Sequence, residues 1–448
     1  TQSRSSAASD VYKRQIKSIG ELSMNYLDSL YWIHERTKFG IKPGVKRMEW
    51  MLNHLNNPQL NIRGIHVGGT NGKGSTVAYL RAALVENGYE VGTFTSPFIE
   101  TFNERISLNG YPISNDEIVE LVKRVKPVSE ALEQETELGS ATEFEIITTM
   151  MFLYFGEIHP VDFVIVEAGL GIKNDSTNVF TPILSILTSI GLDHTDILGS
   201  TYLDIAKDKG AIIKPNVPVI YAVKNEEALK YIRDLAENQN AKPIELDREI
   251  IIVSEDDEFT YRYKDYELET IILDMIGDHQ KENASLAITA LIELNEENII
   301  ELDFNKMIDA IESVCWTGRI EQVKEKPLII IDGAHNNESV EALVSTIKNY
   351  YDLEKMDVLF SAIKGKPVNE MLSKLQNLAG TFYFTEFDFH KALSKQELLE
   401  SIDADNIEYI DDYVDFINHY DGEGLLITGS LYFISCLLYT SDAADDLL

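Results

Sequence analysis

Cysteine, positive charge and long apolar runs are all scarce in this chain. Only two of its 448 residues are cysteine, which argues against a disulfide framework and favours a reducing, cytoplasmic location. No apolar run reaches the roughly 18–20 residues that cross a bilayer, because Thr428, Gly429 and Ser430 interrupt the nearest one, 425–439. The net charge of −35 argues against nucleic acid, since its phosphates require clustered Lys and Arg. We therefore expect neither a membrane nor a nucleic-acid partner.

The two ends of the chain lack any structural pattern. Residues 1–15 are polar and patternless, and 441–448 form a low-complexity run of Ser, Asp, Ala and Leu. We expect 1–23 to be a non-native or disordered extension and 437–448 to be a non-native tail, with Met24 as a candidate natural start. The remaining length is too great for one ordinary core, so we expect at least two domains, in a monomer.

A glycine-rich segment between an apolar run and a helical pattern is the most informative local motif. It spans Arg63–Thr76 and reads RGIHVGGTNGKGST. A strand, a glycine-rich loop and a helix in this order aim backbone N–H groups at a phosphate. Lys73 would add a positive charge, and Ser75 could offer a hydroxyl to Mg²⁺. Because Val67 and Gly74 depart from the standard P-loop pattern, the segment alone indicates no more than a candidate nucleotide site.

Apolar strands alternate with helical patterns along most of the chain. The first part has predicted helices around a turn in 24–55, predicted strands over 91–95, 161–166, 183–190 and 219–223, predicted helices over 115–125, 143–155, 226–236, 283–294 and 303–314, and short antiparallel strands in 249–272. The pattern restarts with strands over 328–331, 358–360, 381–385 and 425–428. This alternation predicts an α/β protein. We expect a P-loop-type, mostly parallel sheet domain over 24–314, a hinge at 315–318 and a smaller Rossmann-like α/β domain over 319–436.

Three polar residues follow predicted strands of the first domain. They are Ser96, Glu167 and His194. Open α/β sheets bind ligands beyond the carboxyl ends of their strands, and Mg²⁺ is commonly held by one or two carboxylates plus phosphate oxygens. Each residue alone also has an ordinary explanation, as a turn serine, a capping acid and a loop histidine. On periodicity alone, Lys209 is a solvated lysine at a helix end.

Eight ordered motifs resemble the Mur ligase superfamily, and within it the folylpolyglutamate synthase/dihydrofolate synthase family. The resemblance covers about 24–435. The motifs are His66–Ser75 (HVGGTNGKGS), Thr95–Pro97 with Asn103–Ile106, Glu167–Gly171, Gly191–Thr195, Gly277–Gln280 with Asn283–Ala284, Trp316–Glu321, Asp332–Asn336 and Gly429–Tyr432. In this family the departures at Val67 and Gly74 are the usual form of the phosphate loop.

The resemblance implies an ATP-dependent acid–amino-acid ligase of folate metabolism. A folate carboxylate would take the γ-phosphoryl group of ATP, and the amine of L-glutamate would then displace phosphate from the acyl phosphate. Dihydropteroate is a further candidate acceptor. Two other classes of enzyme fit parts of the sequence. A cell-wall Mur ligase acting on a UDP-sugar peptide needs an additional N-terminal domain, for which about 40 credible residues leave no room. A P-loop ATPase or kinase would not explain the motifs of the second domain.

The resemblance also assigns roles to residues of the first domain. By family analogy the catalytic groups are Lys73, Glu167, His194 and Lys209, and the Mg²⁺ ligands are Ser96, Glu167, His194 and Lys209. Lys209 would serve as a ligand after N-carboxylation, which requires a neutral amine, and burial near other cations lowers the pKa of a lysine. The implied ATP contacts of this domain are Thr70, Asn71, Gly72, Lys73, Gly74, Ser75 and Asn283.

From the second domain, the implied nucleotide contacts are Arg319 on phosphate, Asp332 on ribose, and His335. The implied pterin or folate contacts are Thr142, Glu143 and Phe144, although this segment also fits an amphipathic helix start with a capping acid. One departure from the family concerns the loop 171–178, in which Ile172 and Lys173 stand where a Gly-Arg pair is usual. Lys173 keeps a positive charge without the planar fork of arginine.

Overall fold

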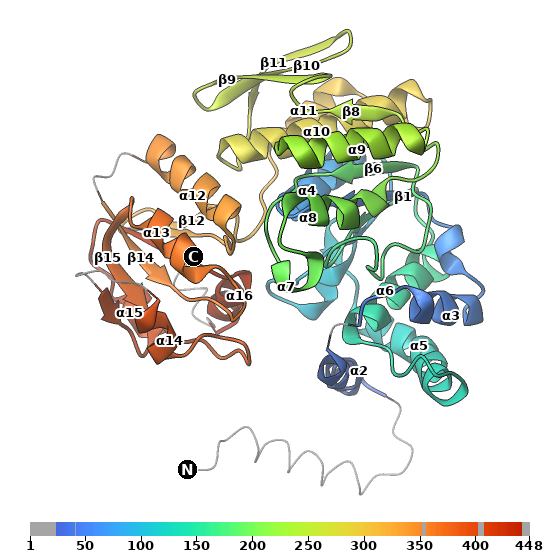
Figure 1. Cartoon of the computed structure of the whole chain (residues 1–448), viewed down its shortest axis with the longest axis horizontal. Helices are drawn as coiled ribbons and strands as arrows, with labels where there is room; N and C mark the ends of the chain where they lie inside the picture. The colour runs from blue at the N-terminus through green and yellow to red at the C-terminus, as the bar shows by residue number, and fades with distance from the viewer. Residues whose placement is uncertain (1–23, 41, 352–354, 402–406, 441–448) are drawn as a thin grey trace, which may run out of the picture.

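The computed structural model describes residues 24–40, 42–351, 355–401 and 407–440. Two α/β units, each built on its own sheet, lie side by side in Figure 1. The predicted extension 1–23 and residues 441–448 are outside the described residues. Residues 437–440 of the predicted tail form the end of helix α16 (Leu431–Thr440), where Leu437 is buried. That part of the tail therefore packs into the fold.

The larger sheet has eight strands in the order β4-β3-β2-β5-β1-β6-β7-β8. The pairings within β2-β5-β1-β6-β7-β8 are all parallel. Its strands are β1 (Gly64–Gly68), β2 (Val91–Phe94), β3 (Ile106–Leu108), β4 (Tyr111–Pro112), β5 (Phe163–Glu167), β6 (Leu184–Leu187), β7 (Val219–Tyr221) and β8 (Pro243–Glu245). Consecutive side chains pack into different cores: Ile165 joins one cluster, and Val164 and Val166 join the other. Burial on both faces explains the continuous apolar runs of these strands.

Helices cover both faces of this sheet (Figure 1). One core contains residues of α4 (Lys73–Glu86), α10 (Asp278–Glu296) and α11 (Phe304–Glu312). The core on the opposite face contains residues of α2 (Tyr26–His34), α3 (Lys46–His54), α5 (Asn115–Glu135) and α6 (Glu143–Leu153). Helices α7 (Thr195–Leu198), α8 (Tyr202–Lys209) and α9 (Glu226–Asn238) follow β6 and β7.

Two smaller sheets complete the structure. The predicted antiparallel strands are β9 (Ile250–Glu255), β10 (Glu258–Tyr263) and β11 (Tyr266–Ile272), and β9 and β10 contact α10. The second α/β unit has the strand order β12-β13-β17-β14-β15-β16, in which only β12 is antiparallel to its neighbour. Its strands are β12 (Glu321–Lys324), β13 (Leu328–Ile331), β14 (Met356–Phe360), β15 (Ala379–Phe384), β16 (Ile407–Tyr409) and β17 (Gly424–Thr428), and its helices are α12 (Asn337–Tyr350), α13 (Val368–Leu375), α14 (Lys395–Glu400), α15 (Tyr413–Asn418) and α16.

The predicted fold class is confirmed, with a mostly parallel sheet followed by a smaller α/β unit. Residues 313–320 between the two units form neither helix nor strand, whereas the domain limits 24–314 and 319–436 stay predictions. Helix α5 is longer than predicted, because it continues through Pro127 to Glu135 while Leu132 packs in the core. Among the described residues, we find no helix with both the length and the apolar character needed to cross a membrane.

Candidate active site

The glycine-rich loop connects β1 to the first turn of α4. Gly69 and Gly72 both have positive φ, of 149° and 88°, which an L side chain rarely adopts. A Cβ atom on Gly72 would lie 2.3 Å from Asn283 Oδ1, so the loop passes directly under α10. Gly72 caps α4 without a side-chain hydrogen bond. The first amides of a helix with no side-chain cap are available to an anion, and the helix dipole favours negative charge there.

Two lysines meet at this loop. Lys73 Nζ donates to the carbonyl oxygens of Gly69 and Thr70, at 3.1 and 3.2 Å. Lys209, the last residue of α8, is 5% exposed, and its Nζ donates to the same Gly69 oxygen at 3.1 Å. Burial and the neighbouring charge of Lys73 lower the pKa of Lys209 to about 7. The structure thus places Lys209 in the site and not at a solvated helix end.

Glu167 and Ser96 lie together beside this pair of lysines. Glu167 ends β5 and is 5% exposed, and the backbone N–H of Ser96 donates to Glu167 Oε2 at 3.3 Å. Burial raises the pKa of Glu167, while the charges of Lys73 and Arg319 oppose that rise. The carboxylate therefore experiences positive charge from Lys73 at the start of α4 and from Arg319 after the connection between the units.

His194 lies in a different environment from Ser96 and Glu167. It has a positive φ of 51° just before α7, and its half-exposed ring faces Lys366 Nζ at 3.5 Å. Partial burial and the charge of Lys366 lower the pKa of His194 to about 4. Within the described ranges, no group of three or more His, Cys, Asp or Glu side chains is arranged to hold a metal. Of the four predicted Mg²⁺ ligands, Ser96 therefore lies next to Glu167, Lys209 lies at the glycine-rich loop, and His194 is turned toward Lys366 of the second unit.

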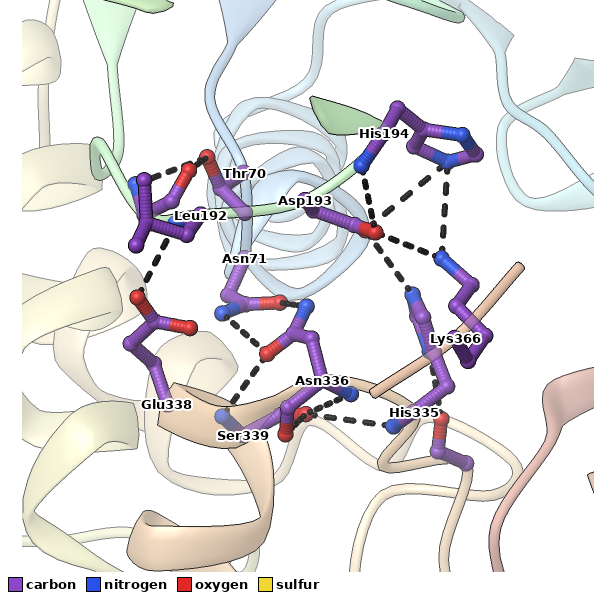
Figure 2. A network of polar contacts seen from close by, with 12 residues as sticks. Thr70, Asn71, Leu192, Asp193, His194, His335, Asn336, Glu338, Ser339 and Lys366 are labelled. Carbon is purple, nitrogen blue, oxygen red and sulfur yellow. Dashed lines mark hydrogen bonds and ion pairs between the residues drawn. The ribbon is translucent and has the colours of Figure 1, made fainter. Parts of the chain in front are cut away.

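A set of polar contacts, which we call the interdomain clasp, joins the two units (Figure 2). Asn71 and Asn336 exchange two amide hydrogen bonds of 3.1 and 2.9 Å. Asp193 accepts a 2.7 Å hydrogen bond from Lys366, and both side chains are at most 10% exposed. The other members of the clasp are His335, which faces Asp193, and Glu338, which accepts from Leu192 N and the Tyr202 hydroxyl. The phosphate loop and the Gly191–Thr195 loop are thereby held against the start of α12.

The predicted nucleotide residues of the second unit lie close together. Asp332 is buried and accepts from the backbone N–H groups of Ile320 and Ala334, at 2.9 and 2.8 Å. A Cβ atom on Gly333 would lie 2.9 Å from Arg319 Nη1, so the guanidinium lies beside the turn that follows Asp332. His335 Nδ1 is 2.8 Å from the Gly333 oxygen.

Trp316, in the connection between the two units, lies beside the glycine-rich segment. Trp316 Nε1 lies 3.2 Å from where a Cβ atom on Gly74 would be. The segment that connects the two units therefore packs against the beginning of α4.

The predicted pterin residues divide between local and site contacts. Thr142 caps α6, and its hydroxyl accepts from Glu145 N in a capping box. Glu143 Oε1 lies 3.1 Å from His34 Nδ1, within hydrogen-bond distance. Phe144 lies next to the loop after Glu167, since its ring would be 2.6 Å from a Cβ atom on Gly169. Of the three, Phe144 is therefore the one that packs against the loop after Glu167.

Arg105, in the Asn103–Ile106 motif, lies close enough to Glu143 and Glu167 to interact with their charges, and no role was predicted for it. Its guanidinium lies 5.2 Å from the Phe98 ring, and its buried Nε has no hydrogen-bond partner among the described residues. Burial lowers the pKa of Arg105, and the charges of Glu143 and Glu167 oppose that effect. The one signal in the sequence that Arg105 is buried is its position directly before the apolar Ile106.

Comparisons with known proteins agree with this geometry. A model of the Mur ligase middle domain matches residues 67–291, and a model of the Mur ligase glutamate ligase domain matches 318–431. A dihydrofolate synthase/folylpolyglutamate synthase of Bacillus subtilis (strain 168) is 46% identical over 420 residues, 92% of this chain and 97% of the relative. The folylpolyglutamate synthase of Lacticaseibacillus casei is 30% identical, covering 93% and 99%.

Solved structures are similar over nearly the whole chain. One is a complex of FPGS with AMPPCP and folate, at 30% identity and a TM-score of 0.81 over 93% of this chain and 99% of that one. Another is a folylpolyglutamate synthase from Thermotoga maritima, at 31% identity and a TM-score of 0.79 over 92% and 95%.

Proposed function

The chain belongs to the folylpolyglutamate synthase/dihydrofolate synthase family of Mur ligases, and we propose that it joins L-glutamate to the carboxylate of a folate with ATP as the energy source. The observation that carries this proposal is the convergence of Lys73, Lys209 and Glu167 at the uncapped start of α4. Such a site neutralises a polyphosphate and keeps a carboxylate next to it.

The reaction divides into two displacements. An oxygen of the folate carboxylate attacks the γ-phosphorus of ATP, and the bond from that phosphorus to the β,γ-bridging oxygen breaks. ADP is released, and the folate carboxylate has become an acyl phosphate. The neutral amine of L-glutamate then attacks the acyl carbon, and inorganic phosphate leaves the tetrahedral intermediate with loss of one proton from nitrogen. Lys73 and the first amides of α4 would hold the γ-phosphoryl oxygens, whose position in the transition state decides the rate.

The donor set around Glu167 fits a magnesium ion. A buried carboxylate whose pKa is raised by burial is stabilised by a nearby cation, and Mg²⁺ takes one or two carboxylates together with substrate phosphates. We propose that Glu167 and the Ser96 hydroxyl hold it, with Lys209 as a further ligand once carboxylated, and that the ion neutralises charge on the phosphates. His194 would join this set only after leaving Lys366. The Ser75 hydroxyl is a secondary candidate for a Mg²⁺ ligand.

The second unit would complete the nucleotide site. We propose that Arg319 contacts phosphate and Asp332 contacts ribose, while Asn283 lies on the adenine side above Gly72. The two units, with predicted limits 24–314 and 319–436, would close about 315–318 and exclude water from the acyl phosphate. The interdomain clasp supports this arrangement, because it already joins the phosphate loop to the turn after Asp332.

The test is a phosphate-release assay with ATP, Mg²⁺ and L-glutamate. One reaction contains tetrahydrofolate and a second contains dihydropteroate, since the Bacillus subtilis relative carries both activity names. We expect release in the tetrahydrofolate reaction that requires both acceptor and glutamate, and we propose the same for dihydropteroate. Release that continues without an acceptor would indicate a simple ATPase. A folded protein that turns over neither acceptor would overturn the proposal.

A further inference from the structure

Positive charge is concentrated in one segment of this acidic protein. Residues 36–47 contain five Lys or Arg residues and no acidic residue, although the whole chain has 74 acidic residues against 39 Lys and Arg. The segment includes the 3₁₀ helix η1 (Glu35–Phe39) and reaches the start of α3. On a chain with a net charge of −35, such a segment can attract a polyanionic ligand locally.

Lys38 and Lys42 converge on the ring of Phe39. Their Nζ atoms lie 5.2 and 4.8 Å from its centre. Within the described part of the chain neither forms an ion pair, whereas Arg36 contacts Glu133 and Arg47 binds the buried Glu145. Lys38 is exposed and Lys42 half-buried. We call Lys38, Phe39 and Lys42 the basic strip.

The basic strip is linked to the active site through the segment that begins α6. Lys42 Nζ donates to the Ser140 oxygen at 3.1 Å, which places it at the turn before α6. Phe144, in the first turn of that helix, borders Gly169 in the loop after Glu167. Gly44 N also donates to the Asn174 oxygen, at 3.3 Å. An acceptor whose reacting carboxylate lies at Glu167 and whose chain runs past Phe144 and Ser140 would be directed toward Lys42.

We propose that the basic strip binds the free carboxylates of glutamates already attached to the folate, an inference that rests on the proposed function. Every attached glutamate leaves one carboxylate that neither links nor reacts, so a longer tail carries more negative charge. Dihydropteroate has one carboxylate, which is the one that reacts. The strip therefore selects folates with glutamate tails over dihydropteroate.

The test compares acceptors in a Lys38→Gln/Lys42→Gln variant. We expect KM for tetrahydrofolate triglutamate to rise about tenfold, the size of two lost exposed charge pairs, with kcat unchanged. KM for tetrahydrofolate monoglutamate should rise less, and KM for dihydropteroate should stay within about twofold. Lys38→Arg/Lys42→Arg should retain the preference, and added salt should weaken it in the unsubstituted protein.

A matched control removes the same charge elsewhere. Lys230→Gln/Lys348→Gln changes two exposed lysines on α9 and α12, far from α2 in Figure 1, and should leave all three acceptors unaffected. An equal rise in KM for triglutamate and dihydropteroate would overturn the inference, because it would indicate a general effect on the site. If the unsubstituted protein turned over none of the acceptors, the proposed function would fall and this inference with it.

Discussion

Lys73 and Lys209 donate hydrogen bonds to the same carbonyl oxygen, that of Gly69, and each bond is 3.1 Å long. Two ammonium groups this close, one of them buried, destabilise each other's charge. The pKa of Lys209 is accordingly lowered to about 7, so much of this side chain is neutral at neutral pH. A neutral amine can react with carbon dioxide to form a carbamate, which is the modification proposed for Lys209.

Replacement of Lys209 should abolish most of the activity in a way that a small carboxylate repairs. We expect Lys209→Ala to lower kcat by about 100-fold or more, the size typical for a lost electrostatic group at the reacting phosphate. Added acetate should restore part of the rate by occupying the vacated space. Lys209→Arg keeps a positive charge but cannot be carboxylated, so it should be inactive and not respond to acetate. Turnover of Lys209→Ala near that of the unsubstituted protein would refute the assignment.

Glu167→Gln should separate magnesium binding from stability. The amide keeps an acceptor for Ser96 N but removes the negative charge, so we expect about 100-fold lower kcat/KM and a higher Mg²⁺ requirement. Because burial of the carboxylate raises its pKa, the metal-free variant should be as stable as the unsubstituted protein or more so, by about 1 kcal/mol. Magnesium titrations of turnover and urea unfolding in EDTA measure the two effects. An unchanged Mg²⁺ dependence would exclude Glu167 as a ligand.

The central strands and the phosphate loop could be predicted from sequence for one physical reason. Strands such as β1 and β5 are buried on both faces, so they read as continuous apolar runs, and polar residues at their ends are conspicuous. The short edge strands β4 and β16 were not predicted, since their residues are mostly half-buried or exposed. Helix α5 extends beyond its predicted end at Val125: it continues through Pro127, a residue that disfavours helix interiors, and its later residue Leu132 packs in the core.

Contacts between the two units could not be predicted in the same way. Asp193 and Lys366 are 173 residues apart and lie in loops of different units, so no local periodicity relates them. Asp193 lies within a motif recognised by its order along the chain, which says nothing about its partner. The orientation of His194 toward Lys366 depends on the same contact, so it could not be predicted from the sequence either.

The Asp193–Lys366 pair should contribute measurably to holding the units together. Burial opposes the charge on Asp193, but His335 and Lys366 hold the pKa of that carboxyl well below its usual range. Lys366→Met removes the closest cation from the mostly buried carboxylate, so we expect a loss of about 3 kcal/mol in the free energy of unfolding. Small-angle scattering should show a larger radius of gyration as the clasp loosens.

A double-mutant cycle distinguishes this pair from general damage. Adding Asp193→Asn to Lys366→Met should cost less than the sum of the single changes, with a coupling of about 1–3 kcal/mol. The control is Lys364→Met, two residues away, whose exposed ammonium pairs with Glu397 inside the second unit. That change should alter stability by less than about 0.5 kcal/mol. Additive effects of Asp193→Asn and Lys366→Met would contradict an interdomain ion pair.

His66 should make the folded state sensitive to acid. It is fully buried in β1 with Nε2 2.9 Å from Thr177 Oγ1, and burial lowers its pKa to about 3. The unfolded chain binds a proton at this histidine below its ordinary pKa of about 6.5, whereas the folded chain does so only near 3. Between pH 6.5 and pH 3, folding therefore requires His66 to release its proton. Stability should fall with decreasing pH across this window, by about 1.4 kcal/mol per pH unit from this group.

The variant His66→Gln tests this directly, because glutamine can place an amide near Thr177 but does not titrate. At pH 7.5 we expect it to be less stable by about 1–2 kcal/mol, from lost packing against Phe180. Between pH 6.5 and 5 the difference in the free energy of unfolding between the variant and the unsubstituted protein should shrink by about 2 kcal/mol. The reason is that acid destabilises the protein with the buried histidine but has no such effect on glutamine. Urea unfolding at the three pH values measures it. A difference that stays constant with pH would mean that His66 is protonated in the folded protein as readily as in the unfolded chain.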